Sequence, residues 1–527
     1  MKNRLHLTWG SLLLLLALLA GVYAPVPAQN LRSARWSLAA QRPLAWQSKV
    51  DAWVSETAAS GETEFIIYLS EQADLSGAAA LKTKQEKGAY VYQQLVEMAQ
   101  RTQGPLLADL QAQGLEYRSF WIANMVWARG DLQAVQRLAE RSDVAHLYAN
   151  PTVRLQEPAE TPSQAESAPE ALEWNIAQVN ANDVWALGYT GQGAVVGGQD
   201  TGYDWDHPAL INQYRGWDGS TADHNYNWHD AIHGNNPNTL PGNPCGFNSP
   251  VPCDDVDHGT HTMGTMVGDD GAANQIGMAP GARWIGCRNM EQGWGTPATY
   301  MECYQWFVAP TNLNDANPRP DLAPDVINNS WACPPGEGCT DPTVLQTVVE
   351  NVRTAGILTI HSAGNSGNAC STVEDPAAIY DASFTVGATD SADSIAGFSS
   401  RGPVTVDGSN RLKPDISAPG VGVRSSIPGT GYSSWSGTSM AAPHVAGLVA
   451  LLISADPSLA GQVDQLEAIV RQSALPRTTT QTCGGVPGTQ IPNNTYGWGR
   501  INALAALRSA VIFTYFPIAA KETGFTP

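Results

Sequence analysis

Gly437-Thr438-Ser439-Met440-Ala441-Ala442-Pro443-His444 runs without a break into the apolar stretch 445–452. This pattern predicts a buried helix with Ser439 in its first turn. The first backbone N–H groups of a helix lack partners and the helix dipole is positive there, so a negatively charged oxygen is stabilised at this place. A serine so placed is suited to nucleophilic catalysis if other segments supply a base and a group that orients it. Helix capping is the commoner use of such a serine, so the pattern alone does not decide.

Two upstream motifs supply the missing groups. Asp200, in Gln-Asp-Thr-Gly, follows an apolar run that reads as a buried strand, and His258 opens His-Gly-Thr-His. The order Asp, His, Ser is that of subtilisin. With these three motifs, the region from about Trp174 to about Ala506 resembles the subtilisin-like serine proteases (subtilases). The chemistry then assigns nucleophilic attack to Ser439, proton transfer to His258 and orientation of the imidazole to Asp200.

The oxyanion hole and the substrate pocket are assigned by the same resemblance. In Ser362-Ala363-Gly364-Asn365, the Asn365 amide matches the family's oxyanion donor. The related sedolisins use Glu as base and Asp at the oxyanion position, whereas this chain has His258 and Asn365. The resemblance implies that the primary pocket is walled by Ser330-Trp331-Ala332 and Ser362-Ala363-Gly364. The first wall usually reads Ser-Leu-Gly, and we expect a broad or apolar preference.

The alternation of strand-like and helical runs predicts an α/β three-layer sandwich with a mostly parallel sheet over residues 171–508. Before it, residues 61–154 follow a β-α-β-β-α-β order, a ferredoxin-like α+β pattern. This pattern resembles the subtilase propeptide, here 29–155, which in the family inhibits its own protease. An unrelated N-terminal domain is the alternative. The Pro/Ala/Ser/Glu stretch 156–170 reads as a linker and is the expected place of maturation cleavage.

The chain termini carry signals of their own. Lys2 and Arg4 before an apolar run predict a signal peptide over 1–28, with a retained anchor as the alternative. We expect export, no other membrane-spanning segment and no membrane association after signal cleavage. Residues 509–527 form a C-terminal tail of unassigned role, after a helix that we expect to end near Arg508.

All eight cysteines lie between Cys245 and Cys483, which favours disulfides in an exported protein. Eight cysteines allow 105 pairings. Proximity suggests Cys245–Cys253 and Cys333–Cys339, less surely Cys287–Cys303, and leaves Cys370–Cys483. The net charge of −20 disfavours nucleic acid as a partner. Protein or peptide substrates and a monomeric state are expected.

The stretch 206–253 departs from the family and reads as a surface excursion near the substrate cleft. His229 and His233, with Asp223, His224 and Asp230, could form a metal site there, but we favour a solvated loop and predict no metal ligand. No cofactor is expected to be required. The family's calcium loop before Gly277 looks truncated; Asp254, Asp255, Asp269 and Asp270 remain candidates for calcium, with no site placed.

The predicted function is that of a secreted serine endopeptidase made as a self-processing zymogen. Two other classes stay open. A protease-shaped binding protein would usually lack a triad residue, and none is missing. An esterase is the second, but the chain has no Gly-x-Ser-x-Gly motif. His261, His361 and His444 are expected to be hydrogen-bonded core histidines.

Overall fold

The structure is a computed structural model, and it describes residues 45–156, 159–160 and 172–515. The predicted signal peptide, most of the predicted linker and the last part of the tail lie outside these residues. Two domains are described below: a small domain, residues 45–156, and a large domain, residues 172–515.

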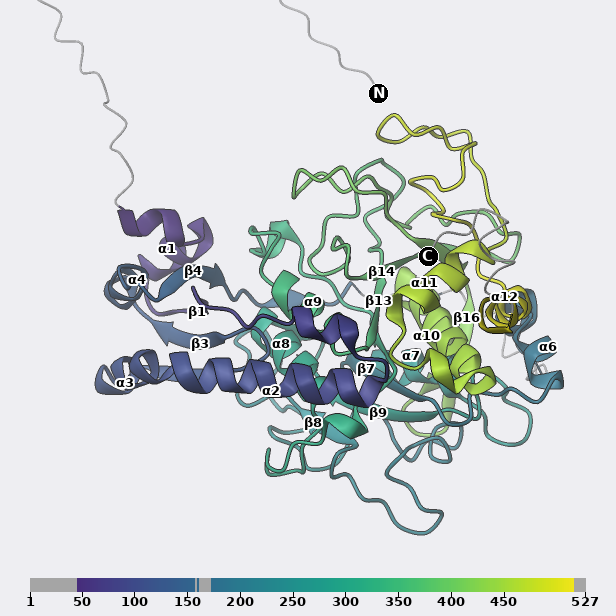
Figure 1. Cartoon of the computed structure of the whole chain (residues 1–527), viewed down its shortest axis with the longest axis horizontal. Helices are drawn as coiled ribbons and strands as arrows, with labels where there is room; N and C mark the ends of the chain where they lie inside the picture. The colour runs from purple at the N-terminus through teal and green to yellow at the C-terminus, as the bar shows by residue number, and fades with distance from the viewer. Residues whose placement is uncertain (1–44, 157–158, 161–171, 516–527) are drawn as a thin grey trace, which may run out of the picture. The chain divides into compact units, whose positions relative to one another are not determined.

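The large domain is built on a seven-stranded sheet in which every pair of neighbours is parallel (Figure 1). The strands, in spatial order, are β15 (Ile416–Pro419), β14 (Phe384–Thr389), β13 (Leu358–Ser362), β12 (Val326–Asn329), β7 (Val195–Asp200), β9 (Arg283–Arg288) and β8 (Trp228–Asp230). Most of their residues are buried, as expected when both faces of a parallel sheet are covered.

Helices cover both faces of this sheet. Successive strand residues point to opposite faces, and Val326 and Ile327 belong to different core clusters. The cluster with Val326 contains α7 (His258–Val267) and α10 (Thr438–Ala455), and the cluster with Ile327 contains α8 (Pro297–Val308) and α9 (Gln346–Thr354). The predicted three-layer α/β sandwich is confirmed.

Helix α10 is the central helix of the domain. Contrary to the expectation that no other segment could span, this helix could cross a membrane by length and composition, but 89% of it is buried inside the fold. Its neighbours include α11 (Val463–Gln472) and α12 (Ala503–Tyr515). Helix α12 runs seven residues past the predicted end at Arg508, because no helix-breaking residue occurs before Pro517. The short helices α5 (Trp174–Gln178) and α6 (Ala181–Ala186) open the domain.

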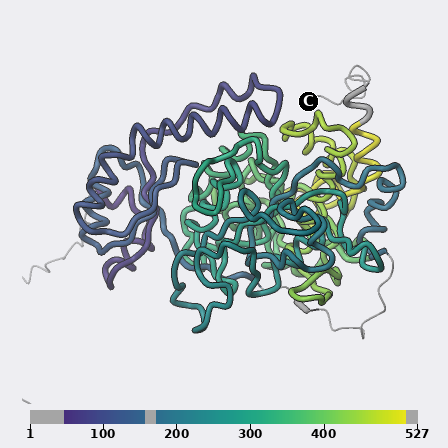
Figure 2. Tube along the Cα trace, turned by 90° about the horizontal axis from the view of Figure 1, so that it is seen from below, coloured from purple at the N-terminus to yellow at the C-terminus, as the bar shows by residue number. Residues whose placement is uncertain are grey.

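The small domain has the predicted ferredoxin-like order. Its antiparallel sheet runs β2 (Glu116–Phe120), β3 (Met125–Gly130), β1 (Thr63–Leu69), β4 (Val144–Ala149). The helices are α1 (Ala52–Ala58), α2 (Lys84–Thr102), α3 (Gly104–Ala112) and α4 (Leu132–Ala139). Figure 2 shows helix α3 following α2 end to end. The predicted break at Gly104-Pro105 is confirmed, because Pro105 lies in the first turn of α3, where its missing N–H costs nothing.

Two minor sheets lie beside the large one. The first pairs β10 (Met290–Glu291) with β11 (Trp294–Gly295) and β11 with β5 (Val153–Arg154). The second pairs β16 (Val423–Ile427) with β17 (Gly431–Ser436) and β17 with β6 (Ala159–Glu160). One edge strand of each minor sheet, β5 or β6, comes from the part of the chain before residue 172.

The stretch 206–253 is only in part the surface excursion that the sequence suggested. Residues 234–251 are exposed or half-buried, as expected. The part before them is not: strand β8 is the edge strand of the large sheet, and Tyr214 and Trp228 are at most 1% exposed. The prediction was wrong there because aromatic residues without a regular period were read as exposed, whereas they pack against Trp284 and Tyr203. All four suggested disulfides are present, and no cysteine is free.

Candidate active site

Asp200 and His258 form a buried pair. Asp200 is the last residue of β7, at the carboxyl end of the sheet, where α/β folds place their active sites. His258 is the first residue of α7. Its Nδ1 lies 2.7 Å from Asp200 Oδ1, and both side chains are 1% exposed. Asp200 Oδ1 also accepts the Thr201 N–H at 2.8 Å. The carboxylate is therefore placed to fix the orientation of the imidazole.

Two glycines allow the start of α7 to approach the turn after β7. A Cβ on Gly259 would lie 2.0 Å from the carbonyl oxygen of Gly202. Gly202 itself has φ of +119°, and a Cβ there would lie 1.7 Å from the carbonyl oxygen of Cys253. Any other residue would force these backbones apart. The glycines of the Asp-Thr-Gly and His-Gly-Thr motifs thus bring the acid and the imidazole together.

Asp254 links the turn after β7 to the start of α7, a contact that the sequence did not suggest. Its Oδ1 accepts from the Thr201 hydroxyl at 2.7 Å, and its Oδ2 accepts from the Thr260 backbone N–H at 2.8 Å. The Thr201 hydroxyl oxygen in turn accepts the Gly259 N–H at 3.0 Å. Two unpaired N–H groups of the first turn of α7 are thereby satisfied. Burial raises the pKa of Asp254 to about 6. The only sign of this contact in the sequence was that Asp254 lies four residues before His258.

Ser439 lies where predicted, in the first turn of α10, and is 4% exposed. Its hydroxyl donates to the Ser330 carbonyl oxygen at 3.4 Å. Among the described residues, His258 Nε2 is buried and has no hydrogen-bond partner. The ring of His258 stacks against that of Trp435 at 6.5 Å between centroids. The structure therefore makes the Asp200–His258 contact and leaves the hydroxyl of Ser439 on a different acceptor.

Asn365 is anchored to the same helix by its oxygen. Its Oδ1 accepts from both the backbone N–H and the hydroxyl of Thr438, each at 2.9 Å. With the oxygen held this way, the amide NH₂ group is the part left to donate. A backbone N–H at the start of α10 and a side-chain NH₂ beside it are the donor pair that an oxyanion hole needs.

The six predicted pocket residues follow two neighbouring strands. Ser330, Trp331 and Ala332 come directly after β12, while Ser362 ends β13 and is followed by Ala363 and Gly364. The two segments thus leave the same edge of the sheet side by side. The ring of Trp331 stacks on Tyr300, at 3.9 Å between centroids, and is turned into the core.

The end of the small domain enters this region. Strand β5 pairs with β11, and the Leu155 N–H donates to the Gly293 carbonyl oxygen at 2.7 Å. The next residue, Gln156, accepts the Asn365 backbone N–H with its Oε1 at 3.3 Å. Beyond it, Ala159 pairs with Ser436, three residues before Ser439. The chain is therefore held on both sides of the candidate nucleophile.

The candidate metal residues of 206–253 have other partners. His229 Nε2 and His233 Nε2 lie 2.9 Å and 2.7 Å from Oε1 of Glu302. The other oxygen of Glu302, Oε2, accepts from Arg118 of the small domain. These bonds hold the pKa of Glu302 below its usual value against the effect of burial. The partners of the other three are protein groups: Asp223 accepts from Asn225, His224 bonds Tyr214, and Asp230 accepts the Ile232 and Ser249 N–H groups.

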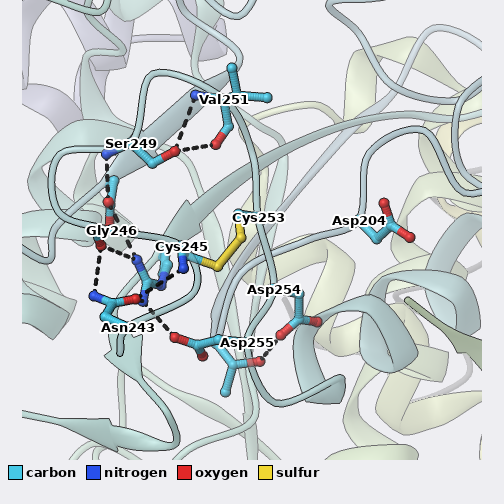
Figure 3. Close-up of a disulfide and its surroundings, with 12 residues drawn as sticks. Asp204, Asn243, Cys245, Gly246, Ser249, Val251, Cys253, Asp254 and Asp255 are labelled. Atoms are coloured by element: carbon cyan, nitrogen blue, oxygen red, sulfur yellow. Dashed lines mark hydrogen bonds and ion pairs between the residues drawn. A yellow bond between two sulfur atoms is a disulfide. The ribbon is translucent and has the colours of Figure 1, made fainter. Parts of the chain in front are cut away.

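The carboxylates considered for calcium are likewise engaged with protein donors. Figure 3 shows the Cys245–Cys253 disulfide with Asp254 and Asp255 directly after it. Asp255 pairs with the guanidinium of Arg288 at 2.6 Å. Asp269 and Asp270 accept backbone N–H groups in their own loop. Calcium binding stays an untested expectation.

The predicted core histidines are confirmed as hydrogen-bonded. His444 lies between Asn175 and the Met440 carbonyl, at 2.8 Å and 2.9 Å, and burial lowers its pKa to about 4. His261 bonds the Ser433 carbonyl at 3.1 Å, and His361 bonds the Tyr304 hydroxyl at 3.0 Å.

Comparison with known proteins shows the family of this chain. Residues 191–499 match the model of the subtilase family. Bacillopeptidase F of Bacillus subtilis (strain 168) is 35% identical over 448 residues, which cover 81% of this chain but 29% of that protein. Subtilisin E of the same strain is 28% identical over 397 residues, covering 75% of this chain and 87% of the relative. M-protease of Shouchella clausii (strain KSM-K16) is 29% identical over 372 residues, which cover 69% of this chain and 77% of the relative. The chain belongs to the subtilase family of serine proteases.

Proposed function

We propose that the chain is an exported serine endopeptidase that cuts peptide bonds with Ser439, His258 and Asp200, and that its first substrate is its own linker. The observation that carries the proposal is the path of the chain past Ser439, held by β11 before the site and by β17 after it. The four disulfides and the predicted signal peptide support export.

The chemistry proceeds by acyl transfer. In the reactive geometry the Ser439 hydroxyl turns from the Ser330 carbonyl toward Nε2 of His258, which is buried and has no partner among the described residues. His258 accepts the hydroxyl proton as the oxygen attacks the peptide carbonyl, and then gives that proton to the leaving amine. Asp200, at 2.7 Å from Nδ1, stabilises the positively charged imidazole that forms in between. Water repeats the sequence to release the acid product.

The negative oxygen of the tetrahedral intermediate is assigned to two donors, the Ser439 backbone N–H and the Asn365 side-chain amide. The anchoring of Asn365 Oδ1 on Thr438 supports this assignment, because it fixes the amide before substrate arrives. Donors fixed in advance need no reorganisation when charge develops, which is why such groups lower barriers effectively.

The self-cleavage site is narrowed from the linker 156–170 to the bonds between Gln156 and Ala159. Before it, Val153 and Leu155 are at most 5% exposed. After the cut, the new carboxyl end would stay bound through β5 and Gln156. The cut small domain would then inhibit the protease as a bound fragment, and the active site would become free only when this fragment is removed.

Ser439→Ala tests the proposal. We expect loss of casein hydrolysis and a precursor that stays uncut, with no new N-terminus between residues 157 and 159. Ser454→Ala is a matched control, since Ser454 lies near the other end of the same helix, where its hydroxyl donates to the Leu451 carbonyl and accepts the Gly191 N–H. Its activity should be unchanged. Normal casein cleavage by Ser439→Ala would end the proposal, and turnover of simple esters without peptide cleavage would favour an esterase.

A further inference from the structure

Three side chains of the kinds that bind metal ions meet where the small domain touches the large one. Asp51 precedes α1 and His146 lies in β4 of the small domain, while Asp341 lies in the large domain two residues after Cys339. One ligand atom from each lies within 4.8 Å of the other two. None of the three takes part in the candidate active site.

The distances within this cluster suit a small cation. His146 Nε2 lies 2.7 Å from Asp51 Oδ1 and 3.6 Å from Asp341 Oδ2. Ligands about 2.0–2.1 Å from a tetrahedral zinc ion are separated by about 3.3 Å. The two observed separations lie on either side of that value, so shifts of about half an ångström would bring each carboxylate to the spacing that a shared ion requires from His146. The ligand atoms of the two carboxylates lie within 4.8 Å of each other.

Neighbouring groups hold both carboxylates in place. The second oxygen of Asp51 accepts the Ala149 N–H at 2.8 Å. The second oxygen of Asp341 accepts from the backbone N–H and hydroxyl of Thr343, at 2.8 Å and 2.6 Å. One oxygen of each carboxylate is thus engaged and the other faces His146. Supporting bonds of this kind orient metal ligands.

The composition of the cluster suits a divalent cation. Asp51 is 6% and Asp341 26% exposed at the side chain, and among the described residues both contact no ionisable partner other than His146. A metal ion binds the deprotonated forms of its ligands, so a bound ion would face an imidazole and two carboxylates, a charge of −2 that a divalent cation balances. A nitrogen ligand favours zinc and similar ions over calcium or magnesium, which prefer oxygen ligands.

We propose that Asp51, His146 and Asp341 bind one zinc-class divalent ion, with water as fourth ligand, and that the ion ties the small domain to the large domain. Ion binding does not rest on the proposed function. Its consequence does: if the small domain inhibits the protease, the bound ion slows its departure after self-cleavage.

The test uses the full chain as the untagged Ser439→Ala precursor, treated with chelator and then titrated with ZnCl₂ in a calorimeter. We expect one zinc ion per chain and, with zinc at about 100 times its Kd, a melting temperature higher by about 3 °C. CaCl₂ and MgCl₂ should bind at least about 10-fold more weakly. Cobalt(II) should give the visible absorption of a tetrahedral site.

Two variants decide whether these residues are the ligands. His146→Gln and Asp341→Asn should each weaken zinc binding at least about 10-fold. His233→Gln is the matched control, because His233 also bonds a carboxylate, that of Glu302, and should leave zinc binding unchanged. Asp341 is the more exposed ligand, so Asp341→Asn still decides if His146→Gln fails to fold.

Either of two results would overturn the inference: no zinc binding tighter than about 1 mM, or equal binding by Asp341→Asn and the unsubstituted precursor. Both are read on an inactive chain, so failure here is distinct from failure of the proposed function. In active enzyme, samples taken at intervals after self-cleavage are run on gel filtration. Chelator should shorten the period during which the cut small domain still co-elutes with the large domain. An unchanged period would contradict the tethering role.

Discussion

Asp375 is a buried carboxyl group behind the pocket wall, and replacing it should change how stability depends on pH. Its side chain is 3% exposed, its Oδ1 has no hydrogen-bond partner among the described residues, and a Cβ on Gly364 would lie 3.2 Å from its Oδ2. Burial, with a smaller effect from Glu374, raises its pKa from 3.8 to about 7. The folded protein therefore holds a proton at Asp375 that the unfolded chain has lost.

The sign and size of the effect follow from this difference. Below about pH 4 the carboxyl group is protonated in both the folded and the unfolded state, so it does not lower the free energy of unfolding. As pH rises from about 4 to about 7, the unfolded state binds fewer protons than the folded state, so stability falls; above about 7 the loss is complete. About three pKa units at 1.36 kcal/mol each give about 4 kcal/mol. At about 2.1 cal/mol/K per residue, this corresponds to about 4 °C in melting temperature for a chain of this size.

Asp375→Asn removes the charge at every pH. Measured by calorimetry on the Ser439→Ala background, the variant should melt about 1.5 °C higher than the parent near pH 5 and about 4 °C higher at pH 8, where the full difference has developed. Glu374→Gln keeps Asp375 and removes the smaller cause, so it should move the fall in stability to lower pH without abolishing it. Parallel profiles for Asp375→Asn and the parent, or a less stable variant at pH 8, would refute the reasoning.

Three further predictions concern the site, the disulfides and the domain contact. Asn365→Ala should lower kcat about 10²–10³-fold with little change in KM, a magnitude known from subtilisin, and steady-state kinetics on a peptide would show it. Loss of Cys370–Cys483, which closes 113 residues, should cost about 5 kcal/mol in denaturant unfolding, against about 2.5 kcal/mol for Cys245–Cys253, which closes 8; equal costs would contradict the chain-entropy explanation. Lys84→Ala leaves Asp325 buried without its 2.6 Å partner, so the precursor should lose about 3–5 kcal/mol, whereas the exposed Lys82→Ala should change little.

Local motifs predicted the site better than they predicted its surroundings. Asp200, His258, Ser439 and Asn365 each lie in a short motif whose glycines and helix starts fix their positions, so sequence was sufficient to place them at strand ends and helix starts. The regular alternation of apolar runs predicted the parallel sheet for the same reason. In the small domain, Pro105 marked the division between α2 and α3.

The remainder depended on contacts between distant segments. Asp254 is tied to Thr201 and Thr260, a link that no spacing in the sequence announces. Strand β8 is too short to give a strand pattern and is defined by its pairing with β9. The convergence of His229 and His233 on Glu302, 69 residues or more away, could not be read from their i,i+4 spacing.

The central claim is that Ser439 is a nucleophile made reactive by His258. Labelling the processed enzyme with a fluorophosphonate and mapping the adduct by mass spectrometry tests it directly. We predict one adduct, on Ser439. This adduct should be lost when His258 is replaced by Ala, while the control Ser454→Ala labels normally. An enzyme that stays unlabelled, or an adduct on another serine, would contradict it.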